Sequence, residues 1–321
     1  MKKRTKIWLI TAASLLLGGI ILFGGAMTLL NWDFMKLSTV KYETTDVEIT
    51  EEFRDVSVSS KTANIELLPS TDGKAHVVCY EPKKAKHEVA VENGTLVVKL
   101  VEKKKWYDYI GVDFRTAKVK VYLPAEEYGA LSIQNRTGSI TVPHDFTFES
   151  MTLKASTGRI KNGASVTGKA FIKTSTGGIC VENATTGSLE LSVSTGNVTV
   201  SNVTCTGDVK LSNSTGKTTL SNLGCQNLQS KGTTGGLSMQ NVVASGNFSI
   251  ERDTGDVKFI GCDAAEISIK TDTGDIKGSF LSDKIFIYRT DTGKVSLPDV
   301  MSGGKCTLKT DTGNIKITIQ K

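Results

Sequence analysis

The sequence of 321 residues has little proline and histidine, and none of its cysteines are spaced as CxxC. Five prolines together with 39% hydrophobic residues exclude a collagen-like or disordered chain, because enough apolar surface is present to form a core. The three histidines, His76, His87 and His144, lie outside the segment that holds five of the six cysteines. A zinc finger or a thioredoxin-like motif is therefore not indicated, and we expect no cofactor.

The cysteines are also too sparse for the disulfide framework of a small secreted domain. We expect Cys180, Cys205, Cys225, Cys262 and Cys306 to be small buried hydrophobic residues. Cys205 and Cys225 take the same position in successive repeats, where their Cα atoms would lie roughly 5 Å apart. That distance permits a disulfide bond, but we expect two free thiols.

An excess of one charge is nearly absent once the amino terminus is set aside. The formal net charge is +6, but Lys2, Lys3, Arg4 and Lys6 precede the first apolar segment and leave 35 basic against 33 acidic residues. This balance provides no basic footprint for nucleic acid, so we expect no nucleic-acid partner.

A long uncharged run follows this basic tail of residues 1–6. Residues 7–30 read IWLITAASLLLGGIILFGGAMTLL, and 24 residues at about 1.5 Å each can cross the hydrocarbon core of a bilayer. Because a signal peptide has a shorter apolar region, a retained transmembrane helix is expected. The basic tail predicts a single-pass protein of the cell membrane with a cytoplasmic amino terminus. The extracytoplasmic region would begin with a juxtamembrane linker over residues 31–45.

The rest of the chain is dominated by an internal repeat. A Thr-Gly pair recurs ten times at intervals of 19 or 20 residues. Apolar residues occupy nearly all of the positions seven and five residues before the glycine and two residues after it, with polar residues between them. This spacing predicts short strands joined by a tight glycine corner. The corner glycines are Gly138, Gly158, Gly177, Gly196, Gly216, Gly235, Gly255, Gly274, Gly293 and Gly313.

Units this short cannot bury an apolar face alone and must stack on one another. We therefore predict an all-β fold in which residues 131–321 form a single-chain β-solenoid, or β-helix, with a right-handed coil. Residues 46–130 are predicted to form irregular first coils and a cap, with a hairpin at Asn93-Gly94. The last strand, within residues 314–321, is followed by no cap, so its edge is expected to be open to another chain.

A polar column supports the stacking. Four asparagines each follow the corner glycine by six residues, so their amides are predicted to form a ladder along the solenoid axis. They are Asn183, Asn202, Asn222 and Asn241.

Four repeats contain Asp-Thr-Gly, the tripeptide that carries the catalytic carboxylate of aspartic proteases. The aspartates are Asp253, Asp272, Asp291 and Asp311, and serine takes their place in four other repeats. Serine cannot replace a catalytic carboxylate, whereas both side chains accept hydrogen bonds from backbone N–H groups in turns. We therefore reject the protease interpretation, and expect no catalytic residues and no enzyme.

The same four aspartates leave calcium binding as an alternative, because stacked carboxylates supply oxygen ligands. The favoured interpretation is a solvated edge whose repulsion is offset by neighbouring cations, and no metal site is assigned. The cations are Lys270, Lys277, Arg289 and Lys309.

Two sets of basic residues are candidate binding sites. The segment KKKWYDYIG contains Lys103, Lys104, Lys105, Trp106 and Tyr107, a composition suited to anionic polymers, lipid head groups or sugars. A loop folded back on the first coil is the favoured interpretation of this segment, with surface binding as the alternative. Basic residues also recur four positions before the corner glycine, where they could attract an anionic polymer such as a teichoic acid. These are Lys154, Lys173, Lys231, Lys270, Arg289 and Lys309.

The chain resembles a bacterial family of membrane-anchored β-strand-repeat proteins, named "putative adhesin", which includes LiaG-like envelope proteins. The resemblance lies in the anchor, the segments LSTVKYETTDVEITEEFRDVSVSSKTANIELLPSTDGKAHVVCYE, GTLVVKL and VKVYLPAEEYGALSIQNRTGSI, and the Thr-Gly coils in this order. It covers roughly residues 40–321 and implies a β-solenoid at a Gram-positive-type cell surface. It transfers no catalytic residues, and fold analogy alone does not establish adhesion.

These features predict a membrane-anchored binding, adhesion or scaffolding module of the cell envelope, with a cell-wall polymer or a membrane protein as partner and a role in envelope stress. One alternative is a polysaccharide-active β-helix enzyme, which would need acidic residues beside Lys or Arg in one groove. The other is a regulatory subunit of a membrane sensor, because the anchor places the domain beside other membrane proteins.

Overall fold

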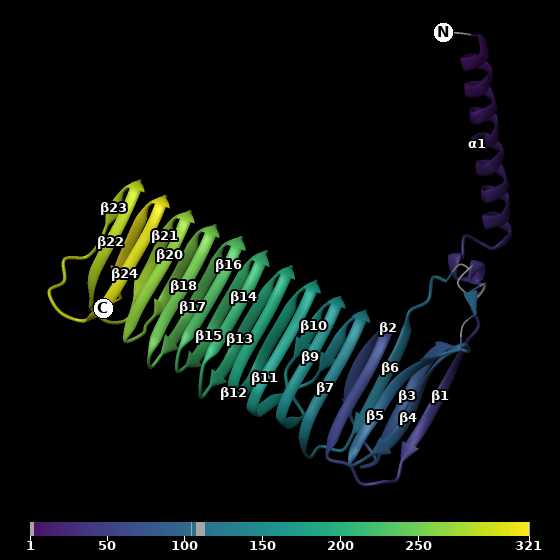
Figure 1. Ribbon diagram of the computed structural model, residues 1–321, viewed down its shortest axis with the longest axis horizontal. Coiled ribbons are helices and arrows are strands. Elements are labelled where there is room, and N and C mark those ends of the chain that lie inside the picture. The colour runs from purple at the N-terminus through teal and green to yellow at the C-terminus, as the bar shows by residue number, and fades with distance from the viewer. Residues whose placement is uncertain (1–2, 104, 107–112, 321) are drawn as a thin grey trace.

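A computed structural model describes residues 3–103, 105–106 and 113–320. The chain begins with helix α1 (Lys3–Leu29), which leaves one end of a long β-structure (Figure 1). Within the described residues, α1 is the one helix long and apolar enough to cross a membrane, with a mean hydropathy of 2.2. The predicted linker over residues 31–45 contains the short 3₁₀ helix η1 (Phe34–Leu37) and the start of strand β1 (Tyr42–Ile49).

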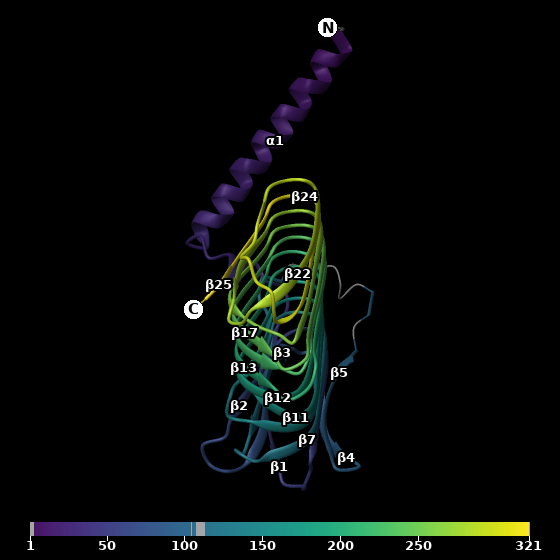
Figure 2. The same cartoon turned by 90° about the vertical axis from the view of Figure 1, so that its left-hand side faces the viewer.

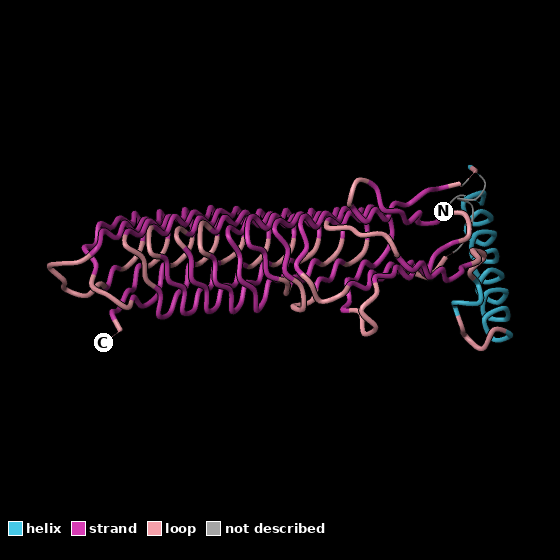
Figure 3. Tube along the Cα trace, turned by 90° about the horizontal axis from the view of Figure 1, so that it is seen from below, coloured by secondary structure: helices cyan, strands magenta, loops and turns pink. Residues whose placement is uncertain are grey.

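The body of the protein is the predicted β-solenoid. Each coil contributes one strand that ends at the Thr-Gly corner and a second strand that begins after it, so that two layers of strands enclose a common interior (Figures 2 and 3). We call the first layer the front face and the second the back face. The strands of the body are β7 (Glu127–Thr137), β8 (Ile140–Val142), β9 (Thr147–Thr157), β10 (Ile160–Asn162), β11 (Ser165–Thr176), β12 (Ile179–Thr195), β13 (Val198–Cys205), β14 (Val209–Thr215), β15 (Thr218–Cys225), β16 (Leu228–Thr234), β17 (Leu237–Ala244), β18 (Asn247–Thr254), β19 (Val257–Cys262), β20 (Glu266–Thr273), β21 (Ile276–Phe280), β22 (Lys284–Thr292), β23 (Val295–Ser296), β24 (Gly304–Thr312) and β25 (Ile315–Ile319).

Successive coils pair in parallel with their repeat positions in register. On the front face Leu191 of β12 lies opposite Leu211 of β14, and on the back face Val198 of β13 lies opposite Thr218 of β15. Strand β12 runs through both faces, with its first half paired to β13 and its second half to β14. The predicted apolar columns therefore face one continuous core, in which Leu191 and Leu211 are both buried.

The corner glycines are required by conformation, as predicted, and also by the space available to them. Gly196 has φ of 147°, a value that residues with a side chain rarely adopt. A Cβ atom at Gly196 would lie 1.9 Å from the carbonyl oxygen of Gly177 in the coil before it. The backbones of successive corners therefore approach each other too closely for any side chain.

A buried polar column beside these corners was not predicted. The residue three positions before the corner glycine points into the interior, and where it is threonine its hydroxyl donates to the corner carbonyl of the neighbouring coil. Thr174 donates to the Gly158 carbonyl at 3.2 Å, and Thr310 donates to the Gly274 carbonyl at 2.9 Å. These bonds satisfy corner carbonyls that would otherwise lack a partner inside the solenoid.

The predicted asparagine ladder is present. The Asn202 amide donates to Asn183 at 3.0 Å, Asn222 donates to Asn202 at 2.8 Å, and Asn241 donates to Asn222 at 3.0 Å. All four residues have positive φ between 50° and 54°, which asparagine tolerates better than most residues. The column therefore marks a second corner of the coil.

The amino-terminal region adds one coil and a cap. Strand β2 (Asp55–Pro69) runs through both faces, pairing in parallel with β7 and β8 on one side and with β5 (Thr95–Glu102) and β6 (Ala117–Leu123) on the other. Antiparallel pairs then extend the back face through β6, β3 (Ala75–Pro82) and β1, and the front face through β5 and β4 (Ala85–Glu92). Only β2 in this region is a coil in register with the repeats. The predicted Asn93-Gly94 turn joins β4 and β5.

The prediction of an open edge at the last strand is wrong in part. Strand β24 lies between β20 and β22, and Ile315 and Lys316 of β25 lie between β21 and β23, whereas residues 317–319 pair with β21 alone among the described strands. The last coil in sequence is therefore inserted beneath the coil that precedes it, and β22 and β23 form the outer edge (Figure 1). Tyr288, at an interior position of β22, is 55% exposed because no further coil covers it.

All six cysteines are free. Cys205 and Cys225 are both buried at the ends of β13 and β15, and burial raises the pKa of the Cys225 thiol to about 12. The expectation of two free thiols at these positions is confirmed.

Candidate functional site

A surface depression lies on the front face, over the first regular coils. It has a volume of about 480 Å³ and is open to solvent along one side. We call it the front-face groove. Its lining residues are Ser59, Ser60, Gln134, Asn135, Arg136, Lys154, Ala155, Ser156, Phe171, Lys173 and Ser175.

The fold explains why cations line this groove. Residues four and two positions before the corner glycine alternate with the interior positions, so both point outward from the front face. Lys173 of β11 lies directly opposite Lys154 of β9, because the two strands pair in parallel with the repeat in register. The stacked coils therefore place the two lysines on neighbouring strands, roughly 5 Å apart at their Cα atoms.

These groove cations have no acidic partner in the described part of the chain. Arg136, Lys154 and Lys173 form no ion pair within 4.0 Å there, and serine occupies the position two residues after each lysine. The Lys154 ammonium lies 5.6 Å from the centre of the Phe171 ring, within the range of a cation–π contact. The groove thus presents positive charge, an aromatic ring and hydroxyl groups together.

The same basic column is neutralised farther along the solenoid. Lys270 pairs with Asp272 at 3.2 Å, and Lys309 pairs with Asp311 at 3.4 Å. Arg289 pairs with Asp291 at 3.0 Å in the same way. In each case the acid is the aspartate of Asp-Thr-Gly, two residues after the cation on the same outward side of the strand. Lys231 pairs with Glu251 at 2.9 Å. Among the described residues, the predicted basic column therefore has unpaired cations only at the groove.

This pairing also gives the Asp-Thr-Gly aspartates a role. Three of the four predicted carboxylates, Asp272, Asp291 and Asp311, each contact a cation of their own coil. The insertion of the last coil places Asp311 between the strands that carry Asp272 and Asp291. The column is thus a line of surface ion pairs, as the favoured interpretation expected, and calcium binding stays an untested prediction.

A further set of acidic side chains connects successive corners on the back face. The Asp256 carboxylate accepts from the Asp275 backbone N–H at 3.0 Å, and Asp275 accepts from the Asn314 N–H at 2.7 Å. The bond from the Asp275 N–H, and then the Lys258 ammonium, lower the pKa of Asp256. A hydrogen bond from Lys277 and then the Asn314 N–H lower the pKa of Asp275.

These shifts predict a loss of stability in acid. A carboxylate whose pKa is lower in the folded state contributes stability above its unfolded pKa of about 3.9, and this contribution disappears as pH falls through the folded pKa. Asp275→Asn keeps an acceptor oxygen but cannot titrate. Asparagine already fills this role in the neighbouring coil, where the Asn314 side chain accepts from the Lys294 backbone N–H. We expect the variant to lose less thermal stability than the unmodified protein between about pH 5 and about pH 2. Parallel unfolding curves at these pH values measure it, and equal losses would contradict the prediction.

The predicted cluster around Trp106 is not part of the front-face groove. Lys103, Lys105 and Trp106 lie in the described chain, and the Trp106 side chain is 76% exposed. Lys103 lines a separate depression, and its backbone N–H donates to the Lys84 carbonyl at 2.9 Å. Lys104 and Tyr107 lie outside the described residues.

The front-face groove was predicted only in part. Lys154 and Lys173 were predicted, but Arg136 and Phe171 were not considered as binding residues. The sequence spacing could have identified both residues. Arg136 is two residues before a corner glycine, and Phe171 is two residues before Lys173. Arg136, Phe171 and Lys173 therefore all point outward from their strands.

Comparison with known proteins supports the architecture. The family model described as "Toastrack DUF4097" matches residues 53–213 and 185–321. The chain belongs to this Toastrack family. No curated protein matches the chain.

Among solved structures that resemble this Toastrack chain are two from Parabacteroides distasonis. One, titled "putative lipid binding protein", has 14% identity and a TM-score of 0.48, and covers 88% of this chain and 98% of its own. Another, titled "putative adhesin", has 13% identity, a TM-score of 0.44 and the same coverage. A "putative adhesin" from Bacteroides fragilis has 17% identity and a TM-score of 0.35, covering 87% of this chain and 97% of its own.

Proposed function

We propose that this Toastrack protein is a membrane-tethered surface module whose front-face groove binds an anionic polymer of the cell envelope. The observation that carries the proposal is the division of the basic column into free and paired cations. Lys154 and Lys173 lack the carboxylate partners that Lys270 and Lys309 have at equivalent positions. A row of unpaired cations on rigid strands suits a ligand with regularly spaced negative charges, such as a phosphate-linked polymer.

The tether in this proposal is α1. Its apolar length fits a single span, and the basic residues that precede residue 7 favour a cytoplasmic amino terminus. Trp8 and Trp32, which are 74% and 58% exposed, would then lie near the two interfaces of the bilayer. The solenoid would extend outside the membrane, where envelope polymers are accessible.

A binding role is favoured over the alternative of a polysaccharide-active enzyme. None of the residues that line the front-face groove is Asp, Glu, His or Cys. Glycoside hydrolysis requires a pair of carboxyl groups across the scissile bond, so this lining offers neither the acid nor the base. The groove residues can hold a charged chain but have no group suited to proton transfer at neutral pH.

Retention on a polyanion tests the proposal. Full-length protein in phosphatidylcholine nanodiscs would be applied to immobilised poly(glycerol phosphate) at low and at high salt. We expect retention at low salt that falls as salt screens the charges. The double variant Lys154→Gln/Lys173→Gln should bind about fivefold more weakly, as expected for losing two exposed charge contacts worth about 0.5 kcal/mol each.

A matched control comes from the paired end of the same column. Lys270→Gln/Lys309→Gln removes the same number of charges at equivalent positions, but each lysine already contacts an aspartate. We expect this variant to retain most of the binding. Equal losses in the two variants would assign retention to net charge, and no retention at low salt would exclude the proposed function.

A further inference from the structure

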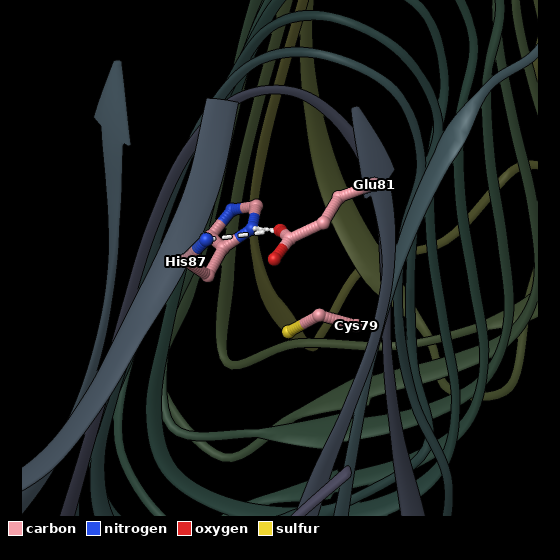
Figure 4. Close-up of side chains that lie close together, drawn as sticks. All are labelled: Cys79, Glu81 and His87. Carbon is pink, nitrogen blue, oxygen red and sulfur yellow. Dashed lines mark hydrogen bonds and ion pairs between the residues drawn. The ribbon is translucent and has the colours of Figure 1, made fainter. Parts of the chain in front are cut away.

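Three side chains that commonly bind metals meet inside the amino-terminal cap. Cys79 and Glu81 lie on β3, and His87 lies on β4 (Figure 4). One ligand atom from each residue, the cysteine Sγ, a carboxylate oxygen and a ring nitrogen, lies within 4.8 Å of the other two. Cys79 is 2% exposed, and the side chains of Glu81 and His87 are each 1% exposed.

The strand pattern shows that these residues occupy core positions. Alternate residues of β3 point inward, beginning with Ala75 and Val77 and continuing with Cys79 and Glu81. Strand β3 belongs to the back face and β4 to the front face, so His87 approaches from the opposite layer. Buried carboxyl and imidazole groups are costly in an apolar interior unless they are paired or bind a metal.

The imidazole is already held in an orientation suited to a metal ligand. His87 Nδ1 faces the Glu81 carboxylate, and the His87 backbone N–H donates to Glu81 Oε2 at 2.9 Å. The other ring nitrogen, Nε2, lies 3.0 Å from the hydroxyl oxygen of Ser60 on β2. A metal-binding histidine ordinarily has such a partner on its second nitrogen, which fixes the direction of the first.

We propose that Cys79, Glu81 and His87 bind a zinc ion that joins the two faces of the cap. Sulfur, nitrogen and oxygen donors in one cluster match the preferences of zinc, whereas calcium takes oxygen ligands alone. Bonds of about 2.0–2.3 Å place the ligand atoms of a tetrahedral zinc site roughly 3.3–3.8 Å apart. The present cluster, within 4.8 Å, reaches that geometry by side-chain movements of about 1 Å.

The position of the cluster gives the ion a mechanical role. The inner coils of the solenoid are covered on both sides, but β3 and β4 lie toward the amino-terminal end, where coil stacking has given way to antiparallel pairs. A metal that binds both strands would fasten the front and back layers there. A depression of about 270 Å³ borders His87, and Glu88 and the lysines Lys83, Lys84, Lys86 and Lys103 are among its other lining residues. A water molecule would complete the four ligands of a tetrahedral site.

Cobalt titration tests the site directly. Full-length reduced protein in detergent would be stripped of metal and titrated with CoCl₂, which replaces zinc in tetrahedral sites and gives a near-ultraviolet charge-transfer band when a thiolate binds. We expect the band to saturate at one equivalent and to disappear when ZnCl₂ is added. Cys79→Ser should abolish the band, whereas Cys306→Ser, at another buried free cysteine, should leave it unchanged.

A second measurement guards against a variant that fails to fold. ZnCl₂ should raise the melting temperature of the unmodified protein, because a ligand that binds only the folded state stabilises it. The shift should be lost in His87→Gln and Glu81→Gln. No cobalt band together with no zinc-dependent shift in the unmodified protein would overturn the proposal, leaving a hydrogen-bonded Glu81–His87 pair. A band that persists in Cys79→Ser would overturn it as well.

Discussion

Gly196→Ala should destabilise the protein by more than about 4 kcal/mol, the largest effect expected of any single methyl group in the chain. The new Cβ would meet the Gly177 carbonyl oxygen at 1.9 Å, and φ of 147° at this corner is strained for any residue with a side chain. Backbone atoms of the neighbouring coil cannot move aside without breaking the stacking above and below. Chemical unfolding of the full-length protein in detergent, followed by far-ultraviolet circular dichroism, measures the loss.

Gly224→Ala is the matched control. Gly224 lies in β15, its φ is not positive, and nothing lies within 4 Å of the position that its Cβ would take. The same substitution should therefore change stability by less than about 1 kcal/mol, and the reduced entropy of the unfolded chain favours a small gain. A similar loss at both positions would show that glycine matters for general flexibility and not for the close approach of corners.

Phe259→Ala should remove about 3–5 kcal/mol of stability by opening a cavity in the core. Phe259 on β19 is 1% exposed, and its ring stacks on Phe280 with 4.6 Å between centroids. It also lies over Gly278 of the next coil, where an added Cβ would be 2.3 Å from the ring. The large side chain thus fills the space that glycine leaves, and neighbouring coils can close over that space only in part.

The adjacent residue provides the control for this prediction. Ile260 follows Phe259 on the same strand but points outward and is 58% exposed. Ile260→Ala should change stability by no more than about 0.5 kcal/mol, because little apolar area leaves the core. Thermal and chemical unfolding of both variants compare the two sides of one strand, and equal losses would contradict the assigned orientation of β19.

The parts of the fold that depend on identical positions were predictable from the sequence. Corner glycines, apolar columns and the asparagine ladder each repeat because the coils stack in register. The environment of a position in one coil therefore predicts its environment in the others. The interior threonines, such as Thr174 and Thr310, escaped prediction although they have the same parity along the strand as the apolar columns. Their polarity suggested an outward position, whereas their hydroxyl groups are buried and bond to corner carbonyls.

The order of the last two coils could not be predicted from the repeat, because register alone permits either arrangement. Residues 304–319 and 284–296 carry the same Thr-Gly pattern, and both fit beside β20 and β21. A long connection between them, residues 297–303, allows the chain to return inside the outer coil. The neutral part of the basic column was predicted from the sequence, since a cation and an aspartate two residues apart on a strand share a face.

The cap cluster shows a different limit. Cys79 and Glu81 are two residues apart, but His87 reaches them only because a turn after β3 carries β4 to the opposite layer. A contact between layers depends on tertiary structure, which strand periodicity does not contain. The front-face groove shows the same limit, because a depression depends on the heights of neighbouring side chains across several coils.

Insertion of the last coil in sequence has a consequence for synthesis. Strand β22 has no hydrogen-bonded neighbour among the described strands except β24, so residues 284–296 reach their observed pairing only after residues 304–312 have been synthesised. In a product that lacks residues 304–320, the outer coil would lose the strands with which it pairs and would have to stack directly on β20 and β21.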